Sequence, residues 1–153
     1  MAMQRAIPAD QTHATPHLAL RDAARAIEFY ARAFAAVTTL RLDMPDGRVG
    51  HAELQVGAAR FMLADEFPEV GHVGPATLGG TTVTIAIYVT DVDALTAQAI
   101  AAGATLLRPV KDEFHGDRVA VLQDPFGHRW RFATRVEEVS PAEMQRRLAA
   151  MTG

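Results

Sequence analysis

Three side chains have the chemistry of acid, base or metal-ligand groups and lie in segments with strand-like alternation. His51 and Glu53 are separated by one residue, and His17 lies in an earlier segment. Residues two apart in a strand face the same side, so His51 and Glu53 are a candidate acid/base pair. With His17 they would offer two imidazoles and a carboxylate, which suits a divalent metal. Alternatively, these groups hydrogen bond a ligand or pair with Arg129 or Arg131.

Cationic and hydroxyl groups form a second set of candidate ligand contacts. Arg131 could hold an anionic group of a ligand, or it could pair with Glu53, because an arginine in an otherwise apolar site is costly unless it is paired. Tyr88 offers a hydroxyl donor, although core packing accounts for it equally well. The full set of predicted ligand-binding residues is His17, Tyr88, Arg129, Arg131, Met62, Thr15 and Thr84.

Composition excludes several classes of function. The 153 residues suffice for one domain, and the content of 49% hydrophobic and 22% charged residues is that of a globular protein. A net charge of −3 provides no basic footprint for nucleic acid. The absence of cysteine excludes disulfides and thiol chemistry. No segment reaches the roughly 18 apolar residues of a membrane helix. We therefore expect a cytoplasmic protein with neither nucleic acid nor membrane as a partner.

Two segments of the chain have the same turn and strand residues at equivalent positions, which indicates an internal duplication. Gly47 in the first segment is matched by Gly116 in the second, and Leu54-Gln55 by Leu122-Gln123. One duplication of this length is not a solenoid, since solenoids repeat at shorter periods and need three or more copies. We therefore expect two half-domains related by a pseudo-twofold axis.

Each copy has the element order β-α-β-β-β. Asp22 is placed to cap a helix over 23–34, and Asp91 or Asp93 to cap a helix over 92–102 that ends at Gly103. Ser140 and Glu143 form a capping box for a last helix over 140–151. The expected strands are 15–20, 37–44, 49–56, 60–64, 83–89, 105–110, 118–123 and 129–134.

The predicted fold class is α+β, with the two units forming an eight-stranded cupped mixed sheet with outer helices. By alternation, the polar candidates face the inside of the cup, and Trp130 faces the helices. The domain plan is a flexible arm at 1–14 and a single domain at 15–153, divided into a first unit at 15–66, a Gly/Pro-rich linker loop at 67–82, a second unit at 83–136 and the C-terminal helix at 140–151.

One motif connects this plan to a known family. The turn Asp124-Pro125-Phe126-Gly127-His128 precedes the last strand, and Phe29-Tyr30 lies late in the first helix. With the paired units, these features resemble the vicinal oxygen chelate superfamily, which holds glyoxalase, bleomycin-resistance and dioxygenase-like proteins, and within it the PhnB-like branch. The resemblance implies the fold more than the activity, because one fold hosts many chemistries.

The resemblance also implies where a metal would bind. Family members that use a metal place four ligands, usually His or Glu, at positions that correspond here to Thr15, Met62, Thr84 and Arg131. Neutral hydroxyls bind divalent ions poorly, a thioether is a soft ligand, and arginine repels a cation. We therefore expect no metal and no other cofactor; the alternative is a divalent metal at a relocated site.

Two functions remain open at this stage. The first is a glyoxalase/bleomycin-resistance-like protein that binds a small organic molecule in its cup without the family metal. The second is an enzyme, a lyase or an isomerase, that uses a relocated metal site or the pair His51 and Glu53. In either case the family resemblance implies a homodimer, and the loop over 67–81 and the C-terminal helix are the candidate contacts.

Overall fold

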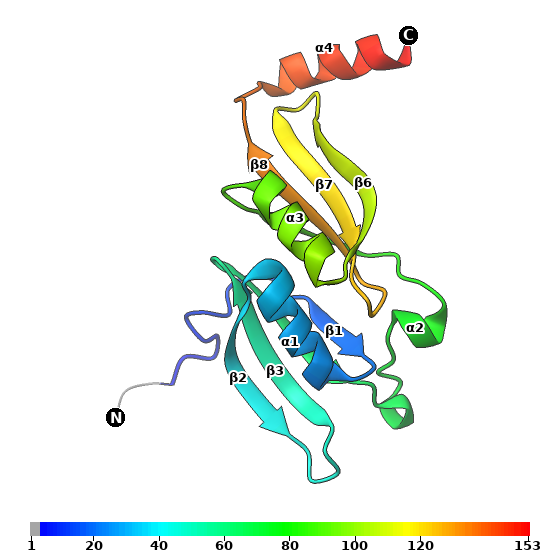
Figure 1. Ribbon diagram of the computed structural model, residues 1–153. Coiled ribbons are helices and arrows are strands. Elements are labelled where there is room, and N and C mark those ends of the chain that lie inside the picture. Colours follow the sequence, from blue (N-terminus) through cyan, green and yellow to red (C-terminus); the bar gives the residue numbers. More distant parts are fainter. Residues whose placement is uncertain (1–3) are drawn as a thin grey trace.

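The computed structural model describes residues 4–153, which form two βαβββ units and a C-terminal helix (Figure 1). Residues 1–3 of the expected arm lie outside the described residues. The first unit contains β1 (His17–Leu20), α1 (Ala23–Phe34), β2 (Val37–Asp43), β3 (Val49–Val56) and β4 (Ala59–Asp65). The second contains β5 (Thr84–Tyr88), α3 (Val92–Ala102), β6 (Thr105–Asp112), β7 (Asp117–Gln123) and β8 (Arg129–Arg135). The linker forms η1 (Pro68–Val70) and α2 (Pro75–Leu78), and α4 (Pro141–Thr152) ends the chain.

The helix boundaries confirm the capping predictions. The Asp22 side chain accepts a hydrogen bond from the Arg25 amide at the start of α1, and Asp91 does the same for Ala94 in α3. Gly103 ends α3 with φ 118°, a left-handed conformation that glycine adopts readily. The two short linker helices are the main elements that the sequence did not predict.

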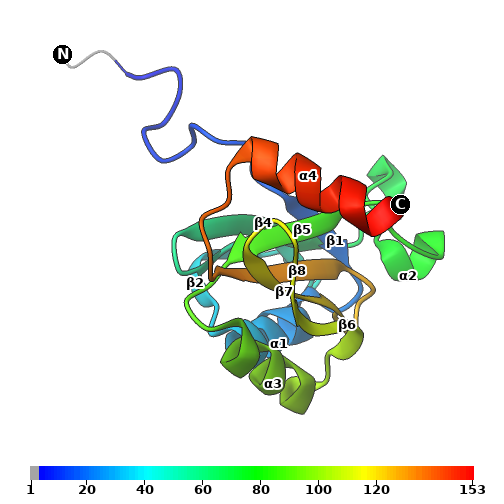
Figure 2. The ribbon, with the colours of Figure 1, turned by 90° about the horizontal axis from the view of Figure 1, so that it is seen from above.

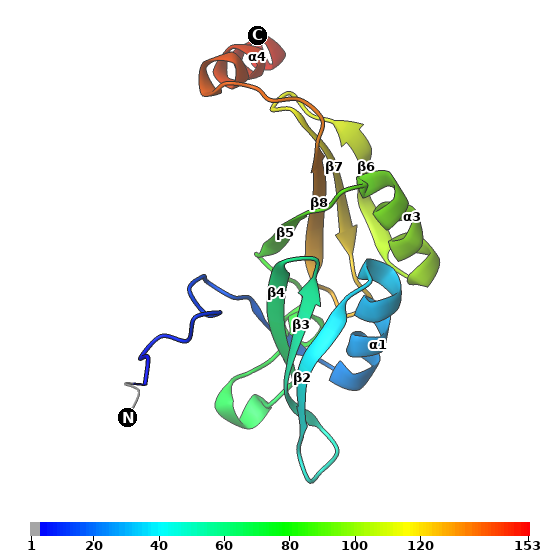
Figure 3. The same cartoon turned by 90° about the vertical axis from the view of Figure 1, so that its left-hand side faces the viewer.

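The α+β class and the duplicated units are confirmed, but the strands divide into two sheets. The strand orders are β1-β4-β3-β2 and β5-β8-β7-β6, with one parallel pair in each sheet. Among the described residues, no strand pairing joins the two sheets. Helices α1 and α3 cover one side of both sheets, and the opposite sides are the inner faces (Figure 3). The expected single sheet is therefore two sheets with a common helical layer.

The core lies between the sheets and this helical layer, and aromatic side chains from both units fill it. Trp130 is fully buried, as its alternation predicts. Its ring centroid lies 5.0 Å from that of Phe34 and 5.1 Å from that of Phe61. Because Phe34 and Phe61 come from the first unit, the two units share one core rather than folding around separate ones.

The Asp124 carboxylate is the main polar connection between the units. It is 3% exposed and accepts four hydrogen bonds. Oδ2 accepts from the Tyr30 hydroxyl at 2.6 Å and from the Trp130 indole at 2.9 Å. Oδ1 accepts from the amides of Phe126 and His128 at 2.9 and 3.0 Å. Burial, followed by the Asp124 charge and hydrogen bond, raises the pKa of Tyr30 well above its usual value, so Tyr30 remains a donor.

The turn that Asp124 organises also contacts the first unit and the linker. The His128 imidazole lies 3.0 Å from the Ala19 carbonyl oxygen, so its Nε2 is the donor. Gly127 has φ 95°, and a Cβ at this position would lie 2.8 Å from the Cβ of Pro75. This turn therefore serves packing, because Gly127 permits the close approach of Pro75 and His128 donates to the first unit.

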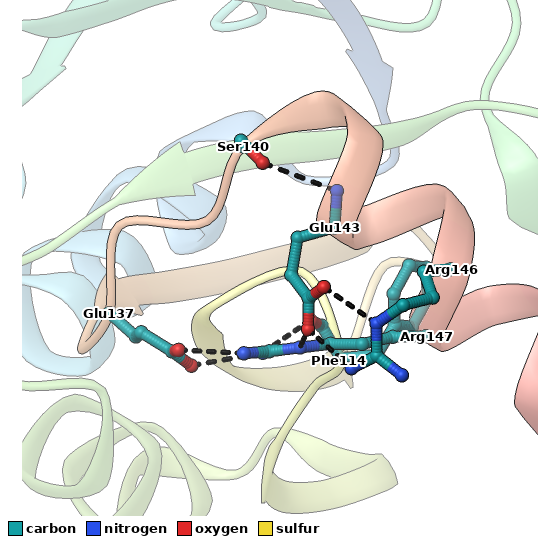
Figure 4. A network of polar contacts seen from close by, with 6 residues as sticks. All are labelled: Phe114, Glu137, Ser140, Glu143, Arg146 and Arg147. Atoms are coloured by element: carbon teal, nitrogen blue, oxygen red, sulfur yellow. Dashed lines mark hydrogen bonds and ion pairs between the residues drawn. The ribbon is translucent and has the colours of Figure 1, made fainter.

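Helix α4 extends from the end of the second unit, on the side away from α1 and α3 (Figures 2 and 3). Its Arg147 donates to Glu137 at 2.8 Å, to Glu143 at 2.9 Å and to the Phe114 carbonyl at 3.1 Å (Figure 4). Arg146 and Arg147 lower the pKa of Glu143 to about 2. The Ser140 hydroxyl accepts from the Glu143 amide, which confirms Ser140 as the N-cap, whereas the Glu143 carboxylate accepts from Arg146 and Arg147 instead of closing the predicted capping box.

Replacing Asp124 with alanine tests whether this carboxylate holds the units together. Asp124→Ala leaves the Tyr30 hydroxyl and the Trp130 indole without an acceptor in the core, and we expect the free energy of unfolding to fall by about 3–5 kcal/mol. Urea denaturation followed by tryptophan fluorescence measures it. Asp43→Ala, which removes a solvent-exposed ion pair with Arg41, should cost at most about 1 kcal/mol. Equal losses in the two variants would contradict the role of Asp124.

Candidate functional site

The inner face of the first sheet carries the predicted acid/base pair. Ala52 and Leu54 are fully buried against the helices, so the alternate residues His51 and Glu53 face the inner side. His51 Nε2 lies 3.3 Å from Glu53 Oε1. The structure therefore places both side chains on one face, in contact, as the spacing predicts.

Arg60 extends this pair into a polar network of four residues. It donates to Glu53 Oε2 at 2.8 Å and to the Asp10 carboxylate at 2.9 Å. The hydrogen bond from Arg60 to Asp10 is the largest cause that raises the pKa of Arg60. Sequence reasoning missed both residues, although Arg60 lies opposite Gln55 on the same inner face. The alternative pairing of Glu53 with Arg131 is wrong, because Glu53 pairs with His51 and Arg60 and the carboxylate near Arg131 is that of Asp117.

Three histidine rings lie close together beside this polar network. The His17 ring centroid is 5.6 Å from that of His51 and 5.1 Å from that of His72. No spacing in the sequence indicated His72, which lies in the linker and pairs with Phe67, two residues after β4, through a β-bridge. Partial burial, then His72, then His51, lowers the pKa of His17. His72 Nε2 is buried and has no hydrogen-bond partner within the described residues.

The arrangement of these groups does not form a metal centre. Within residues 4–153, no three His, Asp or Glu side chains are placed so that they could hold one ion. The family positions do not fit a metal either. Thr15 and Thr84 offer neutral hydroxyls, Met62 a soft thioether and Arg131 a fixed positive charge.

The inner face of the second sheet has a different polar cluster, centred on Asp117. Its side chain is 5% exposed, and Oδ2 accepts from the Tyr88 hydroxyl at 2.5 Å. Arg131 and Arg135 approach the carboxylate to 3.9 and 3.6 Å, and His115 to 3.5 Å. Tyr88 is therefore a donor to a buried acid rather than a packing residue alone, and Asp117 is a site residue that alternation did not single out.

The predicted ligand-binding residues are spread over several cavities. Thr15 and Thr84 line a cavity of about 450 Å³ that also contains Arg60. His17 lines one of about 570 Å³ together with His72 and His128. Arg129 and Tyr88 line two further cavities of about 430 and 590 Å³. His51, Glu53, Met62 and Arg131 line none of these four. The single cup expected from the sequence is therefore divided into several cavities, of which the one of about 450 Å³ is lined by residues of both units.

Comparison with known proteins identifies related sequences and folds. Residues 11–132 match the Glyoxalase/Bleomycin resistance protein/Dioxygenase superfamily. The uncharacterized protein Rv0887c of Mycobacterium tuberculosis is 45% identical over 134 residues, which cover 86% of this chain and 79% of that protein. The family match and this relative therefore both extend over most of the chain.

Two solved structures illustrate the range of this similarity. The crystal structure of TioX from Micromonospora sp. ML1 is 30% identical, with a TM-score of 0.65 over 81% of this chain and 98% of TioX. The PhnB protein from Bacillus cereus is 16% identical, with a TM-score of 0.61 over 80% of this chain and 99% of that protein. At that identity the PhnB protein shows the fold alone.

In the part of the chain that the structure describes, no helix is long and apolar enough to cross a membrane. This finding agrees with the absence of long apolar segments in the sequence.

The histidine cluster predicts a pH dependence that can be measured. A folded-state pKa of His17 below the unfolded value of about 6.5 means that the unfolded chain binds more protons between the two values. The His17 contribution to stability is complete above about pH 6.5 and is lost as the pH falls through the folded-state pKa. Imidazole NMR titration should place the pKa of His17 below 6.5.

Removing one neighbour provides the control for this measurement. His72→Gln removes a nearby imidazole and should raise the pKa of His17, because two protonated rings repel each other. His115→Gln, in the second unit, should leave it unchanged. A His17 pKa that does not respond to His72→Gln would show that the two rings do not interact in solution.

Proposed function

This chain belongs to the Glyoxalase/Bleomycin resistance protein/Dioxygenase superfamily, and from that premise we propose that it binds a small organic molecule on its inner faces without the family metal. The observation that best supports this proposal is the incomplete pairing of the Arg131 guanidinium. Its side chain is 27% exposed, and its closest carboxylate, that of Asp117, is 3.9 Å away. Among the described residues it has no hydrogen-bond partner, and a half-buried guanidinium without acceptors is costly. An anionic or polar group of a ligand would satisfy it.

The donor types at the family positions support binding without metal. Arg131 occupies a position where metal-using relatives have a ligand, and its charge opposes a cation there. Thr15, Met62 and Thr84 supply no carboxylate or imidazole. This combination favours a binding protein in the style of the bleomycin-binding relatives, and within the superfamily we assign it to the PhnB-like branch.

One contact supports a second candidate function. His51 and Glu53 are 3.3 Å apart, which is close to the separation of an acid/base pair. In this alternative the protein is a lyase or an isomerase in which His51 transfers a proton and Glu53 orients the imidazole. Arg60 competes for the Glu53 carboxylate, which favours binding over catalysis.

A thermal-shift screen of small organic molecules, acidic and neutral, tests the proposal. Acidic ligands should raise the melting temperature of the natural protein, and Arg131→Gln should lose most of that rise because the guanidinium contact is absent. Arg32→Gln removes an exposed charge from α1 and serves as the matched control. Ligands that stabilise natural and Arg131→Gln protein equally would refute the role of Arg131.

Metal content decides the other half of the proposal. After incubation with nickel, manganese, iron(II) or zinc and dialysis, elemental mass spectrometry should find far less than one ion per chain. Near-stoichiometric metal would contradict binding without metal and would favour the enzyme, with His17, His51 and Glu53 as the ligands to mutate first.

We also propose a homodimer, in which the partner completes the divided cup. The apolar side chains of Leu40, Leu42 and Met44 are 40%, 55% and 41% exposed, and β2 is an edge strand. Exposed apolar residues along an edge favour burial against another chain. The loop over 67–81 and α4 are further candidate contacts. Light scattering at micromolar concentration should give twice the mass of the chain, and a monomer would remove this part of the proposal.

A further inference from the structure

Cationic side chains are concentrated on the inner face of the second sheet. Arg131 lies opposite Val121 on the neighbouring strand, and Val121 lies opposite Arg108 on the next. Directly opposed residues share a face, and Leu122, the next residue after Val121, is fully buried on the helical side. The same reasoning adds three more cations, so that the face carries Arg108, Lys111, Arg129, Arg131 and Arg135.

These charges are poorly compensated. Asp117 is the carboxylate near them; of the five cations it approaches Arg131 and Arg135, at 3.9 and 3.6 Å, and it also lies 3.5 Å from His115. Among residues 4–153, the side chains of Arg108, Lys111 and Arg129 have no carboxylate within ion-pair distance. The whole chain has a net charge of −3, so the positive charge of this face is opposite in sign to that of the protein as a whole.

On the opposite face of the same sheet, an arginine is paired with two carboxylates. Arg118 on β7 donates to Asp93 at 2.7 Å and to Asp112 at 3.0 Å. The pKa of Arg118 is raised, first by the hydrogen bond to Asp93. The inner cations therefore differ from their neighbours on the same sheet, and self-repulsion among them is a cost that a ligand could remove.

The floor between the cations is apolar. Arg131 and Arg108 are separated by the strand that carries Val121, and two strand spacings correspond to roughly 10 Å. Val121 is partly exposed. A flat organic body would lie on Val121 while its two ends reached Arg131 on β8 and Arg108 on β6.

From this geometry we infer that the second sheet binds an organic dianion, a molecule with two carboxylate, sulfonate or phosphate groups at opposite ends of an apolar body. The inference rests on the proposed function and names its ligand class. A nucleic acid is a poorer match, because its phosphates would require cations along a longer path and because Val121, rather than a row of aromatic stacking residues, lies between them.

Naphthalene-2,6-disulfonate and naphthalene-2-sulfonate are suitable probes, since they share one apolar body and differ in the second charge. Calorimetric titration of the full chain should show the disulfonate binding at least about tenfold tighter than the monosulfonate. Arg131→Gln and Arg108→Gln should each remove most of that difference. Arg32→Gln, on the helical side, should change it less than about twofold, because distant exposed charges are screened.

A double-mutant cycle makes the test specific. If one molecule spans both cations, Arg108→Gln and Arg131→Gln each weaken disulfonate binding and the double variant loses about the sum of the two effects, because each end of the ligand has its own contact. The monosulfonate reaches one cation at a time, so each single variant should cost it little and the double variant much more than the sum. Circular dichroism confirms that each variant is folded.

Three outcomes would overturn the inference. Equal binding of the two sulfonates, with the Arg131 dependence intact, would leave the proposed small-molecule site standing and remove the dianion. Binding of 2-naphthalenemethanol as tight as that of the disulfonate would do the same. A single-stranded oligonucleotide that binds tighter than the disulfonate, through the same two arginines, would make nucleic acid the ligand.

Discussion

The structure depends on one buried carboxylate. Asp124 satisfies a phenol, an indole and two backbone amides at once, and its partners come from both units. A charge this deeply buried is tolerated only when it is surrounded by donors. The position of the last turn, of β8 and of α1 relative to one another is therefore set by hydrogen-bond geometry as well as by packing.

This constraint accounts for the motif by which the family is recognised. The turn at 124–128 resembles a functional motif in sequence, yet its aspartate, histidine and glycine are all used in packing. The chain matches the superfamily over 11–132, although Thr15, Met62, Thr84 and Arg131 are none of the usual metal-ligand types.

The inner faces of the two sheets differ in their balance of positive and negative side chains. On the first sheet, Glu53 is shared by His51 and Arg60, so positive and negative groups are balanced. On the second, Asp117 is the one acid beside Arg131 and Arg135 among residues 4–153. The first sheet therefore carries a compensated network, and the second a cationic surface that Asp117 compensates only in part. A ligand is the simplest source of the missing negative charge.

The sequence by itself determined the local elements and the faces of the strands. The helices over 23–34 and 92–102 begin and end where their caps predict, and the spacing of His51 and Glu53 was enough to place them together. These features depend on residues close in sequence, and a period of two leaves little choice of face.

Only the tertiary structure decided which strands and loops meet. His72 reaches His17 because the linker folds back, and Arg60 reaches Asp10 across 50 residues. The division into two sheets, which separates Glu53 from Arg131, follows from how the two units pack on their common helical layer. Such contacts join residues far apart in sequence, and alternation carries no information about strand order or about the angle between sheets.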